Sequence, residues 1–535
     1  MRGLMQDWPL TVDRILDHAA NVHSASEVVS RRTDGSIHRT SYGAIHRRAK
    51  QLSAALLDLG IKPGERIATL AWNSERHMEC WYGTMGIGAV LHTLNPRLHP
   101  DQLAWIANHA QDRALILDTT FVPIVEAIRD RLPVEHYVII ADRDAMPANS
   151  LNALCYEDWI AGRGPVLQWG GFDENVACGL CYTSGTTGNP KGVLYSHRSN
   201  VLHALMAKGK DALGIGSDDI VMPVVPMFHA NAWGLAFACP MAGAAMVMPG
   251  GQLDGASVYE LLDRERVTFT AAVPTVWLSL LDHLRVEKLS LPYLRRVIIG
   301  GAALPEAILR AFEDDYGVEV VHAWGMTETS PVGTVCTLPR QLADTPPEER
   351  VAHKLRQGRP PFGVEIDLVD DNGGAIARDG KAPGKLLVRG FAVAASYFGG
   401  DGEGILDDNG FFDTGDVATI DPYGSMKITD RAKDVIKSGG EWISSIEIEN
   451  IALSHPAVAN VAAIGVPHPK WDERPVLVVE KRGGAKVTEA ELREFLKDRI
   501  ARWWMPDEFV FLDAIPLGPT GKVNKLALRE MINSR

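Results

Sequence analysis

The sequence has no apolar run of the length that a membrane-spanning helix needs, about 18 to 20 residues. Its most apolar window, residues 235–248, is interrupted by Pro240 and Gly243. Residues 1–10 contain Asp7 and Pro9 and have no apolar centre of the kind found in secretory signals. We therefore expect a cytoplasmic protein with no stable insertion into a membrane.

Cysteine and positive charge are also scarce. The 535 residues include 6 cysteines, of which Cys178 and Cys181 form a single C-x-x-C pair. A zinc site of the common kind needs a second pair, so we expect buried, inert thiols and a reducing compartment. The formal net charge is −13, and no basic stripe offsets it. A nucleic-acid partner is therefore not expected, and any anionic ligand must be attracted locally.

The length and the pattern of apolar runs predict a multidomain α/β protein. A chain of 535 residues is too long for one hydrophobic core. Short apolar runs alternate with helical patterns in the first half of the chain, which is typical of sheets covered by helices. The expected strands are 66–72, 89–94, 114–117 and 137–140, with helices at 74–85 and around 123–130.

The pattern of expected helices and strands changes twice toward the C-terminus. Between residues 363 and 428, short strands with glycine-rich turns predict a small β-rich subdomain. Beyond residue 431 strands at 458–466 and 475–479 and a helix at 489–500 are expected. We therefore expect a large N-terminal domain, 1–430, of helix-covered β-sheets with the β-rich subdomain, followed by a small mobile α+β cap domain, 431–535.

One loop is rich in glycine and in hydroxyl side chains. It follows an apolar strand at 176–180 and reads T-S-G-T-T-G-N-P-K from Thr183 to Lys191. Glycines let backbone N–H groups approach an anion, hydroxyls donate hydrogen bonds, and Lys191 adds a positive charge. The spacing is not that of a Walker A loop, because Pro190 stands where that motif requires glycine. The loop predicts a site for a polyphosphate.

Further motifs follow this loop along the chain. A strand at 296–299 leads into G-G-A-A-L, a turn where a ligand can approach the backbone, and a strand at 318–322 leads into W-G-M-T-E-T. A carboxylate such as Glu328 suits Mg²⁺, and Asp416 can accept hydrogen bonds from two hydroxyl groups. The motifs are G-G-A-A-L at 300–304, W-G-M-T-E-T at 324–329, F-D-T-G-D at 412–416, D-R-A-K-D at 430–434 and P-T-G-K at 519–522.

These motifs, in this order and along nearly the whole chain, resemble those of the adenylate-forming superfamily. That superfamily includes the acyl-CoA synthetases, the adenylation domains of peptide synthetases and firefly luciferase. The resemblance implies that Thr327 contacts the α-phosphate of ATP and that Glu328 and Thr187 hold Mg²⁺. It further implies that the ATP- or AMP-binding residues are Thr183, Ser184, Gly185, Thr186, Thr187, Gly188, Lys191, Gly301, Ala302, Ala303, Trp324, Gly325, Met326, Thr327, Asp416, Arg431 and Lys522.

The resemblance also implies a reaction in two steps. A carboxylic acid attacks the α-phosphorus of ATP, with Lys522 bridging the acid and the phosphate, and the thiol of coenzyme A then displaces AMP. The cap is expected to rotate between the steps about Lys433. This rotation would bring the CoA-binding segment to the site, with Lys437, Ser438, Gly439, Gly440, Glu441 and Trp442.

The acyl-binding region distinguishes the branches of the superfamily. The segment from Phe228 to Gly234 has no carboxylate that could pair with a substrate ammonium, so an amino acid is not expected. This segment and residues 437–445 are similar to bacterial fatty acid–CoA ligases that accept short and medium acids, 3-(methylthio)propionate among them. His229 is expected at the mouth of the acyl pocket, a catalytic position. The other expected pocket residues are Trp233, Trp277, Gly301 and Met326, and both tryptophans could equally belong to the core.

Two alternatives to a CoA ligase stand beside this interpretation. An adenylating enzyme could hand its acyl group to a carrier protein or to oxygen, which would make turnover independent of CoA. The second alternative is a non-catalytic homologue. The presence of Lys191, Glu328, Asp416 and Lys522 argues against it. The resemblance is compatible with a homodimer. The identity of the acid does not follow from the sequence, because each buried methylene contributes only about 0.8 kcal/mol.

Overall fold

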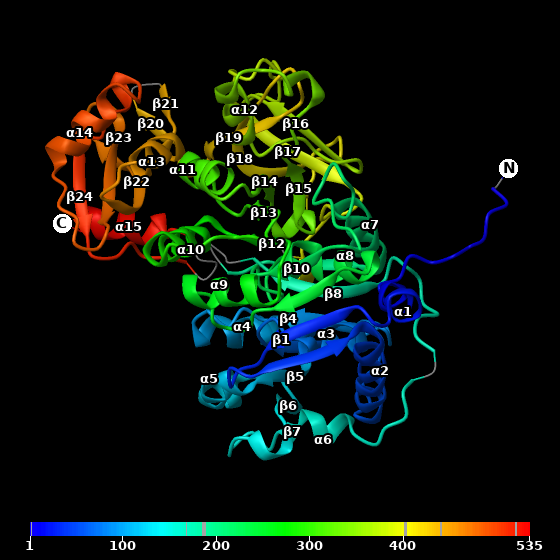
Figure 1. Cartoon of the computed structure of the whole chain (residues 1–535). Coiled ribbons are helices and arrows are strands. Elements are labelled where there is room, and N and C mark those ends of the chain that lie inside the picture. Colours follow the sequence, from blue (N-terminus) through cyan, green and yellow to red (C-terminus); the bar gives the residue numbers. More distant parts are fainter. Residues whose placement is uncertain are drawn as a thin grey trace.

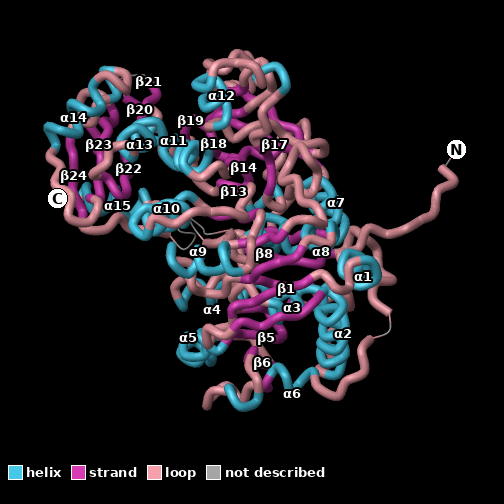
Figure 2. Tube along the Cα trace, in the orientation of Figure 1, coloured by secondary structure: helices cyan, strands magenta, loops and turns pink. Residues whose placement is uncertain are grey.

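The computed structural model describes residues 1, 3–166, 168–183, 189–400, 404–438, 441–518 and 522–534. Two large β-sheets with helices on their faces form the body, and two smaller sheets lie beyond them (Figures 1 and 2). The chain is therefore of the expected mixed α/β class.

The first large sheet has seven strands, parallel except for the last pair. Their order is β7 (Leu154–Cys155), β6 (His136–Ile140), β5 (Asp112–Asp118), β3 (Arg66–Leu70), β4 (Val90–Thr93), β8 (Ala177–Tyr182) and β9 (Gly192–Ser196). The connection from β8 to β9 is the glycine- and hydroxyl-rich loop, so this loop joins two antiparallel neighbours.

The second large sheet has eight strands, of which the outermost pairs are antiparallel and the others parallel. Their order is β15 (Val332–Val335), β14 (Glu319–Gly325), β13 (Arg296–Ile299), β12 (Phe269–Ala272), β10 (Ile220–Pro223), β11 (Ala245–Met248), β1 (Glu27–Arg31) and β2 (Ile37–Ser41). The motifs at 300–304 and 324–329 follow or end the adjacent strands β13 and β14. Parallel pairing brings the ends of these strands to one edge of the sheet.

Helices fill the space between the sheets and cover their outer faces. The layer between the two sheets includes α3 (Glu75–Met85), all of whose residues are buried, α7 (His197–Ala207) and α8 (Leu235–Ala242). The other helices of the body are α1 (Asp13–Val22), α2 (Tyr42–Asp58), α4 (Pro100–Ala110), α5 (Val122–Ile128), α6 (Tyr156–Ile160), α9 (Gly255–Arg264), α10 (Pro274–Glu287), α11 (Glu306–Arg310) and α12 (Pro347–Lys354). The apolar residues of α1 and of the first half of α2 belong to the cluster between the sheets, and those of the other helices pack in three clusters that flank the sheets.

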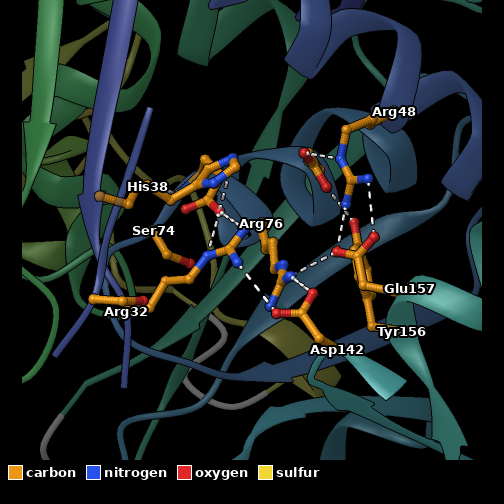
Figure 3. Close-up of polar contacts among 12 residues, drawn as sticks. Arg32, His38, Arg48, Ser74, Arg76, Asp142, Tyr156 and Glu157 are labelled. Atoms are coloured by element: carbon orange, nitrogen blue, oxygen red, sulfur yellow. Dashed lines mark hydrogen bonds and ion pairs between the residues drawn. The ribbon is translucent and has the colours of Figure 1, made fainter. Parts of the chain in front are cut away.

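A cluster of charges ties three of these helices together. The Arg48 guanidinium of α2 lies 2.6 Å from Glu79 of α3 and 2.8 Å from Glu157 of α6 (Figure 3). Arg76 of α3 pairs with the same Glu157 at 2.8 Å and with Asp142 at 2.5 Å. Because α3 is buried between sheets, these ion pairs give Arg76 and Glu79 charged partners and hold the helix against α2 and α6.

The β-rich subdomain is a four-stranded antiparallel sheet of β16 (Val364–Val369), β17 (Gly384–Gly390), β18 (Phe412–Ile420) and β19 (Met426–Arg431). Its apolar face packs with Tyr195 of β9 and Trp324 of β14 in one cluster. The subdomain therefore packs against β9, which follows the glycine- and hydroxyl-rich loop, and against the end of β14.

The C-terminal part has a five-stranded sheet of β21 (Glu441–Ile443), β20 (Ile436–Ser438), β23 (Asp472–Lys481), β22 (Val458–His468) and β24 (Glu508–Leu512). Helices α13 (Ser445–Leu453) and α14 (Glu489–Lys497) pack on one face and α15 (Lys525–Asn533) on the other. It lies beside α10, where Arg482 of the cap contacts Asp282 at 2.7 Å (Figure 1). No helix in the described part of the chain has the length and apolar character needed to cross a membrane.

Candidate active site

The two described ends of the glycine-rich loop are fastened to each other. Thr183 donates its backbone N–H to the carbonyl of Lys191 at 2.9 Å. The N–H of Lys191 donates to Oγ1 of Thr183 at 3.1 Å. The ends therefore close the loop at its base. Ser184, Gly185, Thr186, Thr187 and Gly188 lie outside the described residues, so the predicted role of Thr187 toward a metal stays a prediction.

Thr327 and Glu328 occupy a buried turn, η6 (Thr327–Thr329), directly after β14. Tyr195 of β9 donates its hydroxyl to the carbonyl of Thr327 at 2.8 Å. Tyr397 donates its hydroxyl to Oε1 of Glu328 at 2.7 Å. The ammonium of Lys191 lies 4.8 Å from the centre of the Tyr397 ring. Lys191 thus contacts the ring of Tyr397, and Glu328 contacts its hydroxyl.

Glu328 is a buried carboxyl with a tyrosine and two cationic side chains around it. Burial raises the pKa of the Glu328 carboxyl, whereas Tyr397, Lys191 and Arg431 lower it. No group of three or more His, Cys, Asp or Glu ligands gathers among the residues that the structure describes. Mg²⁺ commonly binds through one or two carboxylates together with phosphates and water. A single buried carboxylate near Lys191 of the predicted phosphate loop therefore suits Mg²⁺ that arrives with a nucleotide.

Asp416 of β18 is anchored by two side chains, one from β14 and one from β19. The indole N–H of Trp324 donates to Oδ2 of Asp416 at 2.9 Å, and the Arg431 guanidinium lies 3.6 Å from Oδ1. Asp416 and Arg431 are cross-strand partners in β18 and β19. Burial raises the pKa of Asp416, and Arg431, Trp324 and Lys522 oppose this shift. A fixed, anchored carboxylate of this kind can accept hydrogen bonds from a pair of ligand hydroxyls.

Lys522 belongs to the C-terminal domain, and its ammonium is near Asp416 and Arg431. It lies between β24 and α15, and a Cβ built on Gly301 of the body would be 3.7 Å from its Cε. Burial, together with Arg431 and Lys433, lowers the pKa of Lys522 to about 8, and Asp416 opposes this shift. The cap therefore presents its lysine to the turn that follows β13. Residues 519–521 of the motif lie outside the described residues.

The turn after β13 has the open backbone that the motif predicts. Gly301 has a φ of +77°, a conformation that favours glycine. Ala302 is exposed and Ala303 is partly exposed, so their backbone is accessible. Gly325, at the end of β14, packs so closely that a Cβ there would lie 1.7 Å from the carbonyl oxygen of Pro331. The positive φ of Gly301 and the close approach of Pro331 to Gly325 explain why glycine occupies these two positions.

Part of the expected acyl pocket gathers beside Lys522. His229 precedes a left-handed turn, η4 (Ala230–Gly234), in which Ala230, Asn231, Ala232 and Trp233 all have positive φ. Left-handed backbone costs roughly 1–2 kcal/mol per non-glycine residue and is often found at functional sites. The Trp233 ring lies against Gly300 and Gly301. The pKa of His229 falls to about 4 through burial and through the charges of Lys522 and Arg97.

Of the other two expected pocket residues, Trp277 lies in the core, whereas Met326 lies between Gly325 and Thr327. Trp277 is fully buried and packs edge-on against Phe312 in the core under α10. This placement favours the core alternative for Trp277. Met326 packs against the cluster that joins the β-rich subdomain to the body.

The expected CoA-binding and hinge residues lie between β19 and α13. Lys433 is in the turn that links β19 to β20, and burial and Arg431 lower its pKa. Lys437 is exposed, whereas Ser438 is buried and accepts a hydrogen bond from Arg474 at 3.2 Å. Gly439 and Gly440 lie outside the described residues. Of Glu441 and Trp442 only the backbone, in β21, is described.

Two tyrosines of the site were not identified from the sequence. Tyr195 and Tyr397 hold Thr327 and Glu328, but neither belongs to one of the glycine-rich or charged motifs. Tyr195 lies in β9, which follows the glycine- and hydroxyl-rich loop, and Tyr397 lies in a loop of the β-rich region. Their contacts arise from packing between distant segments, so no local sequence signal indicates them.

Comparison with known proteins agrees with the geometry. Residues 16–398 match the AMP-binding enzyme family, and residues 447–522 match the AMP-binding enzyme C-terminal domain. The chain is 51% identical over 534 residues to a 3-methylmercaptopropionyl-CoA ligase of Ruegeria lacuscaerulensis, covering 99% of this chain and 98% of that protein. It is 45% identical over 532 residues to a medium-chain-fatty-acid–CoA ligase of Ectopseudomonas oleovorans, covering 99% and 97%.

A solved structure extends the similarity to the fold. The anthranilate CoA ligase AuaEII, in complex with anthranoyl-AMP, matches with a TM-score of 0.88 at 26% identity, over 98% of this chain and 99% of that one. These matches confirm the resemblance to adenylate-forming enzymes that the motifs indicate. The chain belongs to the family of AMP-binding enzymes.

Proposed function

We propose that the chain is an AMP-forming acid–CoA ligase. The observation that carries the proposal is the meeting of Lys522 of the cap with Gly301 of the body, within electrostatic reach of Asp416. A cation from one domain thus reaches residues of the other that are expected to hold a nucleotide. The two relatives at 51% and 45% identity, both named CoA ligases, support the same activity.

In the first step, an oxygen of the substrate carboxylate attacks the α-phosphorus of ATP and pyrophosphate leaves. Catalysis of this kind consists mainly of positioning and of neutralising negative charge. Lys522 contacts the attacking carboxylate and the α-phosphate, Thr327 contacts the same phosphate, and Asp416 accepts the ribose hydroxyls. Glu328 would hold Mg²⁺, which would neutralise phosphate charge when bound.

In the second step, the thiol of coenzyme A attacks the carbonyl carbon of the acyl-adenylate and AMP leaves. The incoming thiol needs a path that the first step does not provide. We therefore assign residues 1–430 and 431–535 to two domains that rotate about Lys433, and Lys437 to Trp442 to the CoA path. The sheet topology supports this division. Along the chain, β19 is the last strand of the four-stranded sheet, and β20 is the first strand of the five-stranded sheet.

The proposed substrate is a short- or medium-chain fatty acid or 3-(methylthio)propionate. The names of the similar enzymes support this class. The Trp233 ring against Gly300 and Gly301 supports it too, because a bulky indole shortens the space beyond the site. A cytoplasmic location and a homodimer stay predictions from the sequence.

The proposal is tested by pyrophosphate release from Mg·ATP over a series of carboxylic acids. The series runs from acetate to palmitate and includes 3-(methylthio)propionate and benzoate, each with and without CoA. We expect steady turnover that needs CoA and yields AMP and a thioester, with the highest kcat/KM among short and medium acids. Turnover without CoA would favour a carrier-protein acceptor, and absence of turnover with every acid would contradict the proposal.

A further inference from the structure

Tyr397 is the point where two charged groups of the site meet on one side chain. It is buried, with 8% of its surface exposed, and directly precedes η8 (Phe398–Gly400). Its hydroxyl donates to Oε1 of Glu328 at 2.7 Å. The ammonium of Lys191 lies over its ring, 4.8 Å from the ring centre. The tyrosine thus contacts both the expected metal ligand and the lysine of the phosphate loop.

We propose that Tyr397 is a positioning residue for adenylation, through two separate parts of its side chain. The hydroxyl holds the Glu328 carboxylate in one orientation, ready to bind the metal that accompanies ATP. The ring face holds the Lys191 ammonium by a cation–π contact, ready to bind phosphate oxygens. The inference rests on the proposed function, because it assigns the tyrosine to the first step of that reaction.

The segment that carries Tyr397 is itself fixed on both sides. The N–H of Ala394 donates to the carbonyl of Glu328 at 2.8 Å, which ties the segment to η6. On the other side, a Cβ at Gly192 would lie 3.1 Å from Cβ of Phe398, so the backbone after Lys191 approaches the residue after Tyr397 closely. The position of the ring is therefore set by the backbone on either side of it, and a change at the hydroxyl leaves the ring in place.

The two contacts can be separated by two substitutions. Tyr397→Phe removes the hydrogen bond to Glu328 and keeps the ring beneath Lys191. Tyr397→Leu removes both. The hydroxyl therefore controls how strongly Mg²⁺ increases the affinity for ATP, and the ring controls the affinity for ATP without metal. A purely structural role would weaken ATP binding equally with and without metal.

The test measures ATP binding by calorimetry to the full chain, without acid or CoA, in Mg²⁺ and in EDTA. For Tyr397→Phe we expect the Mg²⁺-dependent gain in ATP affinity to fall about tenfold, as for a lost hydrogen bond to a charged group, with the affinity in EDTA unchanged. For Tyr397→Leu we expect the affinity in EDTA to fall as well, by roughly threefold. The KM for Mg·ATP in pyrophosphate release should rise in parallel.

Tyr423→Phe is the matched control, because Tyr423 lies in a turn with 45% of its surface exposed and should leave both affinities unchanged. Should Tyr397→Leu fail to fold, Tyr397→Phe, which keeps the ring volume, still decides the role of the hydroxyl. A normal Mg²⁺ effect in Tyr397→Phe would overturn the inference and leave the proposed function intact. Failure of the unaltered chain to bind Mg·ATP would instead contradict the proposed function and the inference with it.

Discussion

At the scale of single residues, the site is organised around charges that the fold keeps close together. Lys522 faces Arg431 and Lys433, with Asp416 as a nearby carboxylate. Two neighbouring cations and burial both favour the neutral amine, which is why its pKa falls to about 8. The arrangement has a surplus of positive charge near Lys522, which an anionic ligand would neutralise.

The pH dependence of adenylation should reflect this lysine. A group with a lowered pKa stays protonated below that pKa and loses its charge above it. We therefore expect kcat/KM for pyrophosphate release to be level below pH 8 and to fall above it, because only the ammonium stabilises the transition state. A profile from pH 6.5 to 10 checks this, and Lys522→Arg, whose guanidinium stays charged, should lack the alkaline decline. A decline that persists in Lys522→Arg would assign it to another group.

Residues inside motifs could be predicted from the sequence, and residues outside them could not. Lys191, Glu328, Asp416 and Lys522 stand in local patterns of glycine, hydroxyl and charge, and the structure brings all four to one region. Tyr397 has no such pattern around it. Its contacts depend on how the β-rich subdomain packs on the body, which is information that only the tertiary structure holds.

At the scale of elements, the turn after β14 explains why a strand must end at a glycine. The carbonyl oxygen of Pro331 returns to within 1.7 Å of the place that a Cβ of residue 325 would occupy. The same turn carries Thr327 and Glu328, and Thr329 closes it by accepting the N–H of Met326 at 3.0 Å. The absent side chain at Gly325 therefore allows the close approach that fixes Thr327 and Glu328, the residues predicted to contact the α-phosphate and Mg²⁺.

Gly325→Ala tests this explanation. The added methyl must displace backbone, so we expect the free energy of unfolding to fall by about 1–3 kcal/mol, together with a loss of adenylation. Gly483→Ala is the control, since nothing lies within 4 Å of a Cβ there, and it should change stability by no more than about 0.5 kcal/mol. Chemical denaturation of both variants checks the difference, and equal stabilities would contradict the close approach.

Apolar periodicity in the sequence predicted where many helices and strands lie, but not the residues at which they begin and end. The strand predicted at 296–299 coincides with β13. The helix predicted at 489–500 ends at Lys497 in α14, and the one predicted at 74–85 begins at Glu75, because Ser74 caps it by accepting the N–H of His77. The left-handed turn η4 was not predicted, since four non-glycine residues rarely adopt that backbone.

At the scale of the whole molecule, contacts across the predicted hinge hold the cap over the body. Asp430, before Lys433, accepts hydrogen bonds from the N–H of Ser445 at 2.6 Å and from its hydroxyl at 3.1 Å. Lys525 of α15 donates to the same hydroxyl at 2.6 Å and pairs with Glu449 at 2.7 Å. A rotation of the cap about Lys433 would have to break the contacts of Asp430, so the observed orientation is a defined state.

The exposed contact between the cap and the body adds little to this state. Arg482 and Asp282 are both more than one third exposed, and such pairs contribute about 0–1 kcal/mol. The buried group around Asp430 is the stronger constraint, because breaking it leaves buried polar atoms without partners. The orientation is the one that places Lys522 at the turn after β13, as the first step of the proposed reaction requires.

The role of Lys522 is decided by comparing the two half-reactions in the variant Lys522→Ala. If Lys522 serves only the first step, pyrophosphate release should fall by about 10²–10³, as for a lost transition-state donor. The same variant should convert supplied acyl-adenylate and CoA to the thioester at the rate of the unaltered chain. Equal loss of both half-reactions, or normal pyrophosphate release, would contradict a ligase in which the cap brings Lys522 to the body for adenylation alone.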